Sequence, residues 1–186
     1  MSGAAGRPAF AVFIATSLDG FIARADGRID WLEAANASVP AGEDCGYAAF
    51  MGSVDALLMG RKTFDTVRGF ADWPYGDKPV VVLSRSLRVL PEGLPPSVSL
   101  MAGDPREVAA QLAARGHQRV YLDGGETIQA FVAAGLVDEF VVTRVPVLIG
   151  EGRPLFSALP KDQFWQHADT RSWPFGFVQS RYLAQR

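Results

Sequence analysis

The chain has 186 residues, 48% of them hydrophobic, and its 18 Lys and Arg residues nearly balance its 20 Asp and Glu residues. This composition is typical of one soluble domain with a substantial core, and it lacks the concentrated basic surface that nucleic-acid binding requires. One cysteine and two histidines exclude a disulfide framework and leave few metal ligands, so we expect no metal. No stretch resembles a secretory signal or is long enough to cross a bilayer, which predicts a cytoplasmic protein that binds no membrane.

The predicted elements begin with a strand. Residues 10–17 are nearly all apolar, as expected of a strand buried on both faces. Two Asp-Gly pairs within residues 18–27 mark turns, and the apolar side chains of residues 43–53 have helical spacing. Residues 54–59 are predicted to form a buried strand, followed by a short helix over residues 61–70.

The alternation of strand and helix continues in the middle of the chain. Residues 79–84, rich in β-branched side chains, and residues 98–102 are predicted strands. A helix follows, with Asp104 as its N-cap, Pro105 in its first turn and Gly116 at its end.

The last third of the chain changes pattern. Residues 119–125 form a predicted strand that runs into paired glycines, and the next helix starts at residue 126 and stops around Gly135. The strand-like runs 139–150, 164–173 and 175–184 then follow with no convincing helix between them. Parallel βα units followed by antiparallel edge strands predict one mixed α/β domain over residues 1–186, with helices on both faces of the sheet and residues 1–8 disordered.

The sequence GRKT, residues 60–63, invites comparison with a nucleotide-binding loop. The pattern G-x-x-x-x-G-K-[ST] fails, because Asp55 replaces its first glycine and Arg61 separates Gly60 from Lys62. What remains is a glycine between a strand and a helix, where free backbone N–H groups, two bases and the Thr63 hydroxyl can hold an anion. The alternative is a surface turn with solvated bases.

A second junction of the same kind strengthens the anion interpretation. Gly124 and Gly125 end one strand and open the next helix, although a tight turn alone would also require glycines. Ser84 and Arg85 lie just past another strand end, where the arginine fork matches a phosphate. Several phosphate-binding motifs at strand ends favour a dinucleotide as the ligand, and Arg85 would suit the extra phosphate of NADP. No G-x-G-x-x-G follows a strand, so the site would not be a Rossmann site.

Four motifs, ATSLDGFIA, LLMGRKTF, VVLSR and LDGGETIQAFVAAGLVDEFVVTRVPVLIGEGRPLF, resemble the dihydrofolate reductase superfamily over about residues 10–156. The chain is most similar to the branch that contains the reductase domain of riboflavin biosynthesis, the RibD C-terminal domain. The resemblance implies a three-layer α/β/α fold with a mostly parallel sheet of about eight strands, an antiparallel C-terminal edge, and NADPH across the strand ends. It also implies a homodimer supported by the segment around residues 143–156.

The resemblance assigns cofactor contacts position by position. Ala15 would face the nicotinamide carboxamide; Gly60, Arg61, Lys62 and Thr63 would hold phosphate and the adenosine ribose; Leu83, Ser84 and Arg85 would lie at the adenine and 2′-phosphate; Gly124, Gly125, Glu126 and Thr127 would contact the pyrophosphate and the ring. In the family the paired glycines are often joined by a cis peptide bond.

The implied activity is an NADPH-dependent oxidoreductase that transfers hydride to a C=N or C=O of a small heterocycle. The substrate would be pterin-like, folate-like or ribosylaminopyrimidine-like, as for dihydrofolate reductase or 5-amino-6-(5-phosphoribosylamino)uracil reductase. The alternatives are an NADP(H)-binding protein without turnover, acting as a sensor or oligomeric scaffold, and a scaffold that binds no dinucleotide.

Two acids are candidates on the substrate side. Asp44 precedes Gly60 by 60 − 44 = 16 residues, the interval at which folate reductases carry their acid, but it could also be a helix N-cap. Asp19, in SLDG, could bind substrate hydroxyls or close a turn. Lys78 falls near the position of the arginine that binds the folate tail, and lysine cannot reproduce that two-pronged contact, which argues against folate reduction.

Overall fold

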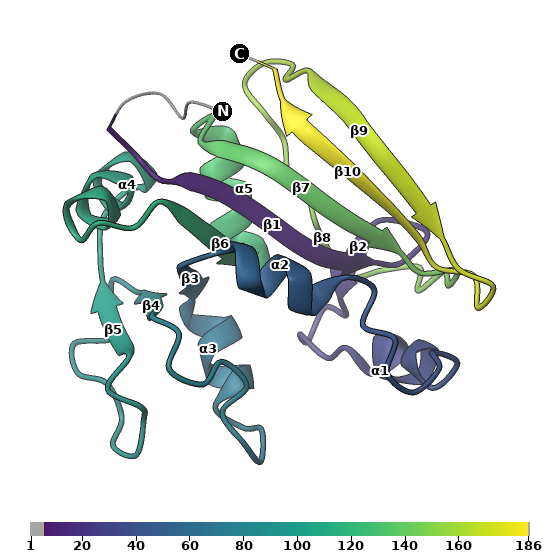
Figure 1. Cartoon of the computed structure of the whole chain (residues 1–186), viewed down its shortest axis with the longest axis horizontal. Helices are drawn as coiled ribbons and strands as arrows, with labels where there is room; N and C mark the ends of the chain where they lie inside the picture. The colour runs from purple at the N-terminus through teal and green to yellow at the C-terminus, as the bar shows by residue number, and fades with distance from the viewer. Residues whose placement is uncertain (1–5, 186) are drawn as a thin grey trace.

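The computed structural model describes residues 6–185, which contain one large sheet, one small sheet and five helices (Figure 1). The strands of the large sheet are β1 (Ala9–Thr16), β3 (Ala56–Gly60), β4 (Val80–Leu83), β5 (Val98–Met101), β6 (Arg119–Asp123), β7 (Val137–Arg144), β9 (Trp165–Ser172) and β10 (Val178–Ala184). The small sheet pairs β2 (Phe21–Ala23) with β8 (Arg153–Pro154). The helices are α1 (Asp30–Asn36), α2 (Tyr47–Ser53), α3 (Arg61–Val67), α4 (Pro105–Ala114) and α5 (Gly125–Ala133).

The eight strands of the large sheet lie in the order β5-β4-β3-β6-β1-β7-β10-β9. All neighbours from β5 to β7 are parallel, and β10 and β9 complete the sheet as antiparallel strands. The predicted mixed sheet with an antiparallel C-terminal edge is therefore confirmed. One detail differs: β7, which the pattern grouped with the antiparallel strands, runs parallel to β1, with Val12 opposite Phe140.

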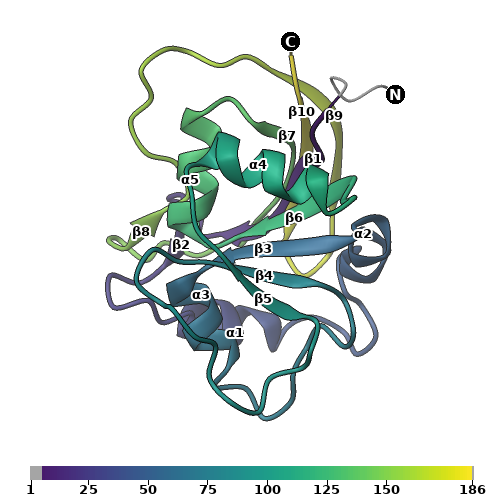
Figure 2. The ribbon, with the colours of Figure 1, turned by 90° about the vertical axis from the view of Figure 1, so that its left-hand side faces the viewer.

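Helices cover both faces of the parallel strands, as predicted. Figure 2 shows α4 and α5 above the sheet and α1 and α3 below it. The side chains of β3 explain how one strand serves two cores: Leu57 and Met59 pack in the cluster with Phe50 of α2 and Phe64 of α3, whereas Leu58 packs in the cluster with α4 and α5. A strand buried on both faces must be apolar throughout, which is why these strands read as continuous hydrophobic runs.

Helix α4 follows the sequence prediction closely. The Asp104 carboxylate accepts hydrogen bonds from the backbone of Arg106 and Glu107, and the Glu107 side chain accepts one from the backbone of Asp104. These bonds form a capping box, and Pro105 occupies the first helical position. The local signals alone therefore determine where this helix starts.

Helix α2 begins later than its predicted start at residue 43. Cys45 has φ 53° and Gly46 has φ 87°, and both values lie in the left-handed region, where a right-handed helix cannot begin. The first helical residue is therefore Tyr47. Asp44 still caps this helix from outside, because its carboxylate accepts hydrogen bonds from the backbone N–H groups of Gly46 and Ala48, both at 2.8 Å.

Helix α1 and the β2–β8 pair were not predicted. Trp31 lies in α1, where it is 4% exposed and packs in a cluster with Val145 and Phe177. No side chain caps the start of α1. Contacts with residues more than a hundred positions away therefore stabilise this short helix, and no local pattern reports them.

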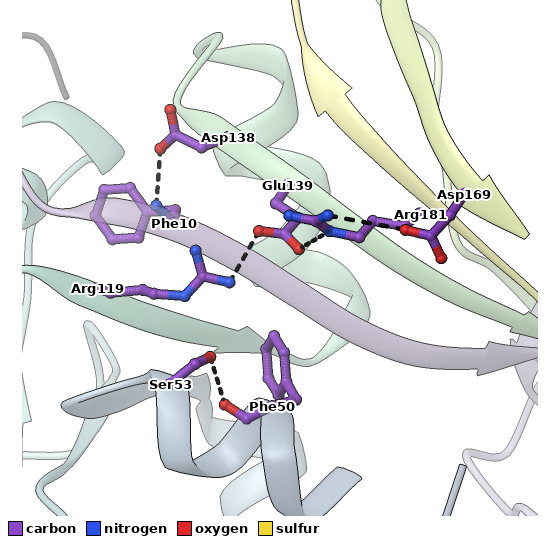
Figure 3. Close-up of polar contacts among 8 residues, drawn as sticks. All are labelled: Phe10, Phe50, Ser53, Arg119, Asp138, Glu139, Asp169 and Arg181. Carbon is purple, nitrogen blue, oxygen red and sulfur yellow. Dashed lines mark hydrogen bonds and ion pairs between the residues drawn. The ribbon is translucent and has the colours of Figure 1, made fainter. Parts of the chain in front are cut away.

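A chain of charges crosses the sheet at the amino ends of its central strands (Figure 3). Glu139 of β7 is 5% exposed and accepts hydrogen bonds from Arg119 of β6 at 2.8 Å and from Arg181 of β10 at 2.7 Å. Arg181 also reaches Asp169 of β9 at 3.8 Å. Burial raises the pKa of Glu139, but the two guanidinium groups outweigh burial and hold it below its usual value. This network links four strands, from the first residue of β6 to the middle of β9.

The N-terminal segment expected to be disordered is only partly covered. Residues 1–5 lie outside the described residues, whereas Arg7 forms an ion pair with Asp138 at 2.9 Å. Among residues 6–185, no helix is long and apolar enough to cross a membrane.

Candidate functional site

The four motifs expected to hold the cofactor end four neighbouring strands. β4, β3, β6 and β1 are adjacent in the sheet and parallel, so their carboxyl ends share one edge. Leu83, Gly60 and Asp123 are the last residues of β4, β3 and β6, and Ala15 lies one residue from the end of β1. Positions 15, 60, 83 and 124, scattered along the chain, are thus brought to one edge, which is where ligands bind in open α/β sheets.

The GRKT and GGET segments interlock. A Cβ on Gly60 would stand 2.8 Å from the Thr127 hydroxyl, and a Cβ on Gly124 would overlap the Thr63 hydroxyl. Each glycine therefore faces the threonine of the other motif. Gly124 also has φ 93°, a conformation that side chains with a Cβ rarely adopt. Both motifs consequently require glycine for close approach to each other, and they form one continuous surface.

Two charged side chains bridge these helix starts. Lys62, in the first turn of α3, forms an ion pair with Glu126, in the first turn of α5. Arg61 pairs instead with Asp65 of its own helix at 2.8 Å. The first-turn N–H groups of α5 have no acceptor within the helix, as at every helix start, and the N–H of Ile128 donates to the carbonyl of Gly124 at 2.9 Å. The junction therefore offers backbone donors, two hydroxyls and two bases to an anion.

The segment after β4 leaves a guanidinium free. Ser84 uses its hydroxyl to accept a hydrogen bond from the backbone of Leu87 at 3.0 Å, which closes the turn. Arg85 is exposed, and within residues 6–185 its side chain makes no hydrogen bond or ion pair. A planar fork of donors without an internal partner is suited to a phosphate.

The paired glycines are not joined by a cis peptide bond. The described residues contain no cis peptide, so the cis bond often found in relatives is absent here. The left-handed conformation of Gly124 produces the turn instead. Strand β2 closes over this turn, because a Cβ on Gly125 would stand 2.6 Å from the Cδ1 atom of Ile22.

The two candidate substrate acids are both engaged with backbone. Asp44 caps α2, and the hydrogen bonds from Ala48 and Gly46 lower the pKa of its exposed carboxyl. Asp19 accepts a hydrogen bond from Ser17 at 2.6 Å, which lowers its pKa, and further bonds from the backbone of Ile149 and Gly150. The geometry favours the N-cap interpretation for Asp44 and the turn interpretation for Asp19.

A third acid, which the sequence interpretation overlooked, lies closer to the glycine motifs. Asp123 is half-buried at the end of β6, directly before Gly124, whose backbone N–H it accepts at 2.8 Å. Its removal from water raises the pKa of the carboxyl from 3.8 to about 6. The sequence did carry a signal, namely an acid that ends an apolar strand immediately before paired glycines.

Three tyrosines lie near enough to this acid to interact with it electrostatically. Burial raises the pKa of Tyr47, Tyr75 and Tyr121, and in each case the Asp123 carboxylate raises it further. The Tyr121 hydroxyl donates to the carbonyl of Phe13 at 3.0 Å. The carboxyl group thus lies near aromatic side chains next to the cofactor motifs, and its pKa is raised toward the neutral range.

Lys78 is engaged elsewhere and does not take the place of an arginine that would bind the tail of folate. Its ammonium donates to the carbonyl of Val54 at 2.6 Å, at the C-terminal end of α2. Among residues 6–185, no group of three His, Cys, Asp or Glu side chains could hold a metal ion.

Comparisons with known proteins agree with this architecture. The family model described as the RibD C-terminal domain matches residues 8–177. A crystal structure from Shewanella sp. PV-4, whose name proposes a riboflavin biosynthesis protein, is 42% identical with a TM-score of 0.89, and the match covers 96% of this chain and 99% of that chain.

Two more distant structures show the same fold. The diaminohydroxyphosphoribosylaminopyrimidine deaminase/5-amino-6-(5-phosphoribosylamino)uracil reductase of Thermotoga maritima is 16% identical with a TM-score of 0.71, and the match covers 96% of this chain but 57% of that one. Dihydrofolate reductase from Enterococcus faecalis, solved as a complex with NADP(H), is 17% identical with a TM-score of 0.62 and coverage of 96% and 97%. The fold is therefore of the dihydrofolate reductase type.

Proposed function

Because the chain belongs to the RibD C-terminal domain family, we propose that it is an NADPH-dependent reductase of a small heterocycle. The bound cofactor would supply a hydride to a C=N or C=O carbon of the substrate. The protein's part is to hold the cofactor, to orient the substrate and to manage a proton.

One observation carries the proposal: the motifs lie along the sheet edge in the order in which the parts of the cofactor are joined. Arg85 after β4 would take the 2′-phosphate, the interlocked motifs after β3 and β6 would take the phosphates, and Ala15 in β1 would face the carboxamide. Adjacent strands are about 4.8 Å apart, so the four strand ends span about 14 Å, a length suited to an extended dinucleotide. A compact anion would need one binding motif rather than several along the sheet edge.

The donor set also fits the cofactor. Gly60 and Gly124 lack the Cβ atoms that would crowd the threonine hydroxyls, and α5 presents free N–H groups beside them. Phosphate oxygens accept from such donors. Lys62 and Arg61 would add charge, each after exchanging its carboxylate partner for phosphate.

Asp123 is our candidate for the proton donor. Its raised pKa of about 6 leaves a protonated fraction near neutral pH, and it precedes the pyrophosphate motif directly. A protonated carboxyl can donate to the atom that gains electrons when the adjacent carbon accepts hydride. Neither Asp44 nor Asp19 offers this, since hydrogen bonds lower the pKa of both.

We extend the proposal to a cytoplasmic homodimer. The segment between β7 and β9 exposes four large apolar side chains, Leu148 at 68%, Phe156 at 52%, Leu159 at 37% and Phe164 at 73%. Apolar surface of this kind is a candidate interface. Light scattering coupled to gel filtration measures the mass directly, and a monomer at micromolar concentration would contradict this part.

Turnover distinguishes the reductase from a protein that only binds NADP(H). NADPH oxidation should be followed with 5-amino-6-(5-phosphoribosylamino)uracil, its dephosphorylated riboside, 7,8-dihydropterin and dihydrofolate. The proposal expects oxidation with a pyrimidine or pterin, and slow or no oxidation with dihydrofolate, because Lys78 is engaged at the end of α2. Tight NADPH binding with no turnover on any of these would favour the sensor or scaffold alternative.

A further inference from the structure

Trp31 carries a buried hydrogen-bond donor that nothing in the described structure satisfies. Its indole Nε1 is one of four buried side-chain nitrogen or oxygen atoms in residues 6–185 that have no partner. The Trp73 indole is likewise buried without a partner, whereas the indole of Trp173 donates to Glu43 at 3.1 Å. A buried donor without an acceptor is costly, so a ligand that brings an acceptor is bound favourably.

The cluster that contains Trp31 borders the proposed site. Trp31 packs in one cluster with Ala15, and Ala15 follows Phe13 on the same face of β1 because side chains alternate along a strand. Asp123 follows Tyr121 on β6 in the same way. Phe13 and Tyr121 both belong to the cluster on the α2 side of the sheet, so Ala15 and Asp123 point to that side too.

The helices do not fully cover this end of the sheet. Ala11 and Tyr121, farther from the carboxyl edge, are buried, whereas Phe13, Ala15 and Asp123 are half-buried. The uncovered surface therefore lies between Trp31 at one side and Asp123 at the other, above the strand where the nicotinamide would lie. On the proposed function, a flat heterocycle that accepts hydride would lie on this surface.

Apolar side chains pack around Trp31. Its neighbours in the cluster include Val145, Phe177, Leu32 and Ala35. An apolar wall with a single donor discriminates strongly, because a ligand that lacks the matching acceptor leaves the donor unpaired. The edge of the substrate ring that faces the Asp123 carboxyl must instead carry a hydrogen-bond donor or an atom that accepts a proton.

We propose that the Trp31 indole N–H donates to an oxo oxygen of the substrate and thereby selects oxo-substituted heterocycles over their amino-substituted counterparts. This inference rests on the proposed reductase function and adds to it a specificity-determining residue and a substrate class. Trp31 takes no part in proton or hydride transfer.

Two matched probes test the selection. 5,6-Diaminouracil carries two ring carbonyls, and in 2,4,5,6-tetraaminopyrimidine both are replaced by amino groups. Protein saturated with NADP, which prevents turnover, should bind the uracil more tightly. Trp31→Phe should weaken the binding of 5,6-diaminouracil by about tenfold and abolish the preference for it over tetraaminopyrimidine. Trp165→Phe is the matched control, because Trp165 packs against Phe140 at the far end of the sheet.

A second measurement observes the hydrogen bond itself. The chain has four tryptophans, so protein labelled with ¹⁵N-tryptophan should give four indole N–H signals, which single Trp→Phe variants assign. Saturation with 5,6-diaminouracil should move the Trp31 signal downfield, and saturation with tetraaminopyrimidine should not. If Trp31→Phe fails to fold, β-(benzothiophen-3-yl)alanine at position 31 preserves the ring shape and removes only the donor.

The outcomes separate the inference from the function on which it rests. Failure to bind NADP would overturn the proposed function and this inference together. If NADP binds, three results overturn the inference alone: neither probe binds, the Trp31 signal stays in place at saturating uracil, or Trp31→Phe retains the preference for the uracil.

Discussion

Gly60 and Thr127, 67 residues apart in the chain (127 − 60), lie so close that a Cβ at position 60 would stand 2.8 Å from the threonine hydroxyl. The contact joins the starts of α3 and α5 at the edge where we place the cofactor. Thr127 is 5% exposed, so its side chain has little room to move away.

Gly60→Ala should therefore destabilise the protein by about 1–3 kcal/mol through overpacking, and weaken NADPH binding. Thermal unfolding and equilibrium titration measure the two effects. Adding Thr127→Ala should restore part of the stability, because it removes the atom that the new methyl group meets. Gly52→Ala in α2, where nothing lies within 4 Å, is the control and should be neutral or slightly stabilising. Equal effects at positions 52 and 60 would contradict the close contact.

Asp123 should make both stability and activity depend on pH. Its pKa is about 6 in the folded chain against 3.8 for an ordinary aspartate. The folded chain therefore binds more protons than the unfolded chain between these values, and stability declines as the pH rises through them. The difference in the free energy of unfolding between Asp123→Asn and wild type should therefore change by about 2 kcal/mol in favour of the variant from pH 4 to pH 7.

The same substitution should remove the pH dependence of the reaction. Wild-type kcat/KM should fall above about pH 6 as the donor ionises, and Asp123→Asn should be slow at every pH. Asp72→Asn, which removes a charge from an exposed loop position, is the control. An unchanged pH profile in Asp123→Asn would exclude Asp123 as the proton donor.

How far the sequence predicts this fold depends on whether the signal is local. Asp104, Pro105 and Gly116 determine α4 because each acts through neighbours in the chain. Trp31 in α1 is stabilised through Val145 and Phe177, and the direction of β7 depends on its pairing with β1. Such long-range contacts leave no trace in spacing or composition.

The site shows the same division. The glycines and bases at strand ends could be recognised because a strand followed by glycine and a helix is a local pattern. The raised pKa of Asp123 could not be predicted from its neighbours alone, since it comes from burial that the whole fold creates. Asp44 and Asp19 were candidates by position, and only the structure showed that backbone N–H groups engage them.

Arg85→Ala should distinguish the two nicotinamide cofactors. Loss of a charged contact to the 2′-phosphate should weaken NADPH binding by about ten- to a hundredfold and leave NADH binding nearly unchanged. Arg28→Ala is the control, because Arg28 is an exposed arginine paired with Asp26. Equal losses for NADPH and NADH would show that Arg85 does not bind the 2′-phosphate.

Glu139→Gln should lower the stability of the fold and leave the affinity for NADPH unchanged. The substitution keeps the shape of the side chain but leaves Arg119 and Arg181 without their shared carboxylate (Figure 3), at a cost of about 3 kcal/mol. Because the pKa of Glu139 is lowered in the folded chain, its stabilisation is present above about pH 4.5 and is lost as the pH falls.

Urea unfolding at pH 7 and at pH 4 measures both parts of this prediction. Glu33→Gln on α1 is the control for loss of an exposed carboxylate. If Glu139→Gln were as stable as wild type at pH 7, the charge network would not contribute to the fold. A large loss of NADPH affinity would show that the two edges of the sheet are coupled.

The central claim is that the carboxyl edge of β4, β3, β6 and β1 binds NADPH, and equilibrium titration tests it most directly. Addition of NADPH should quench tryptophan fluorescence in a saturable manner with one site per chain, and NADH should bind more weakly. If neither NADPH nor NADH shows saturable binding, the reductase assignment is wrong, whatever the fold resembles.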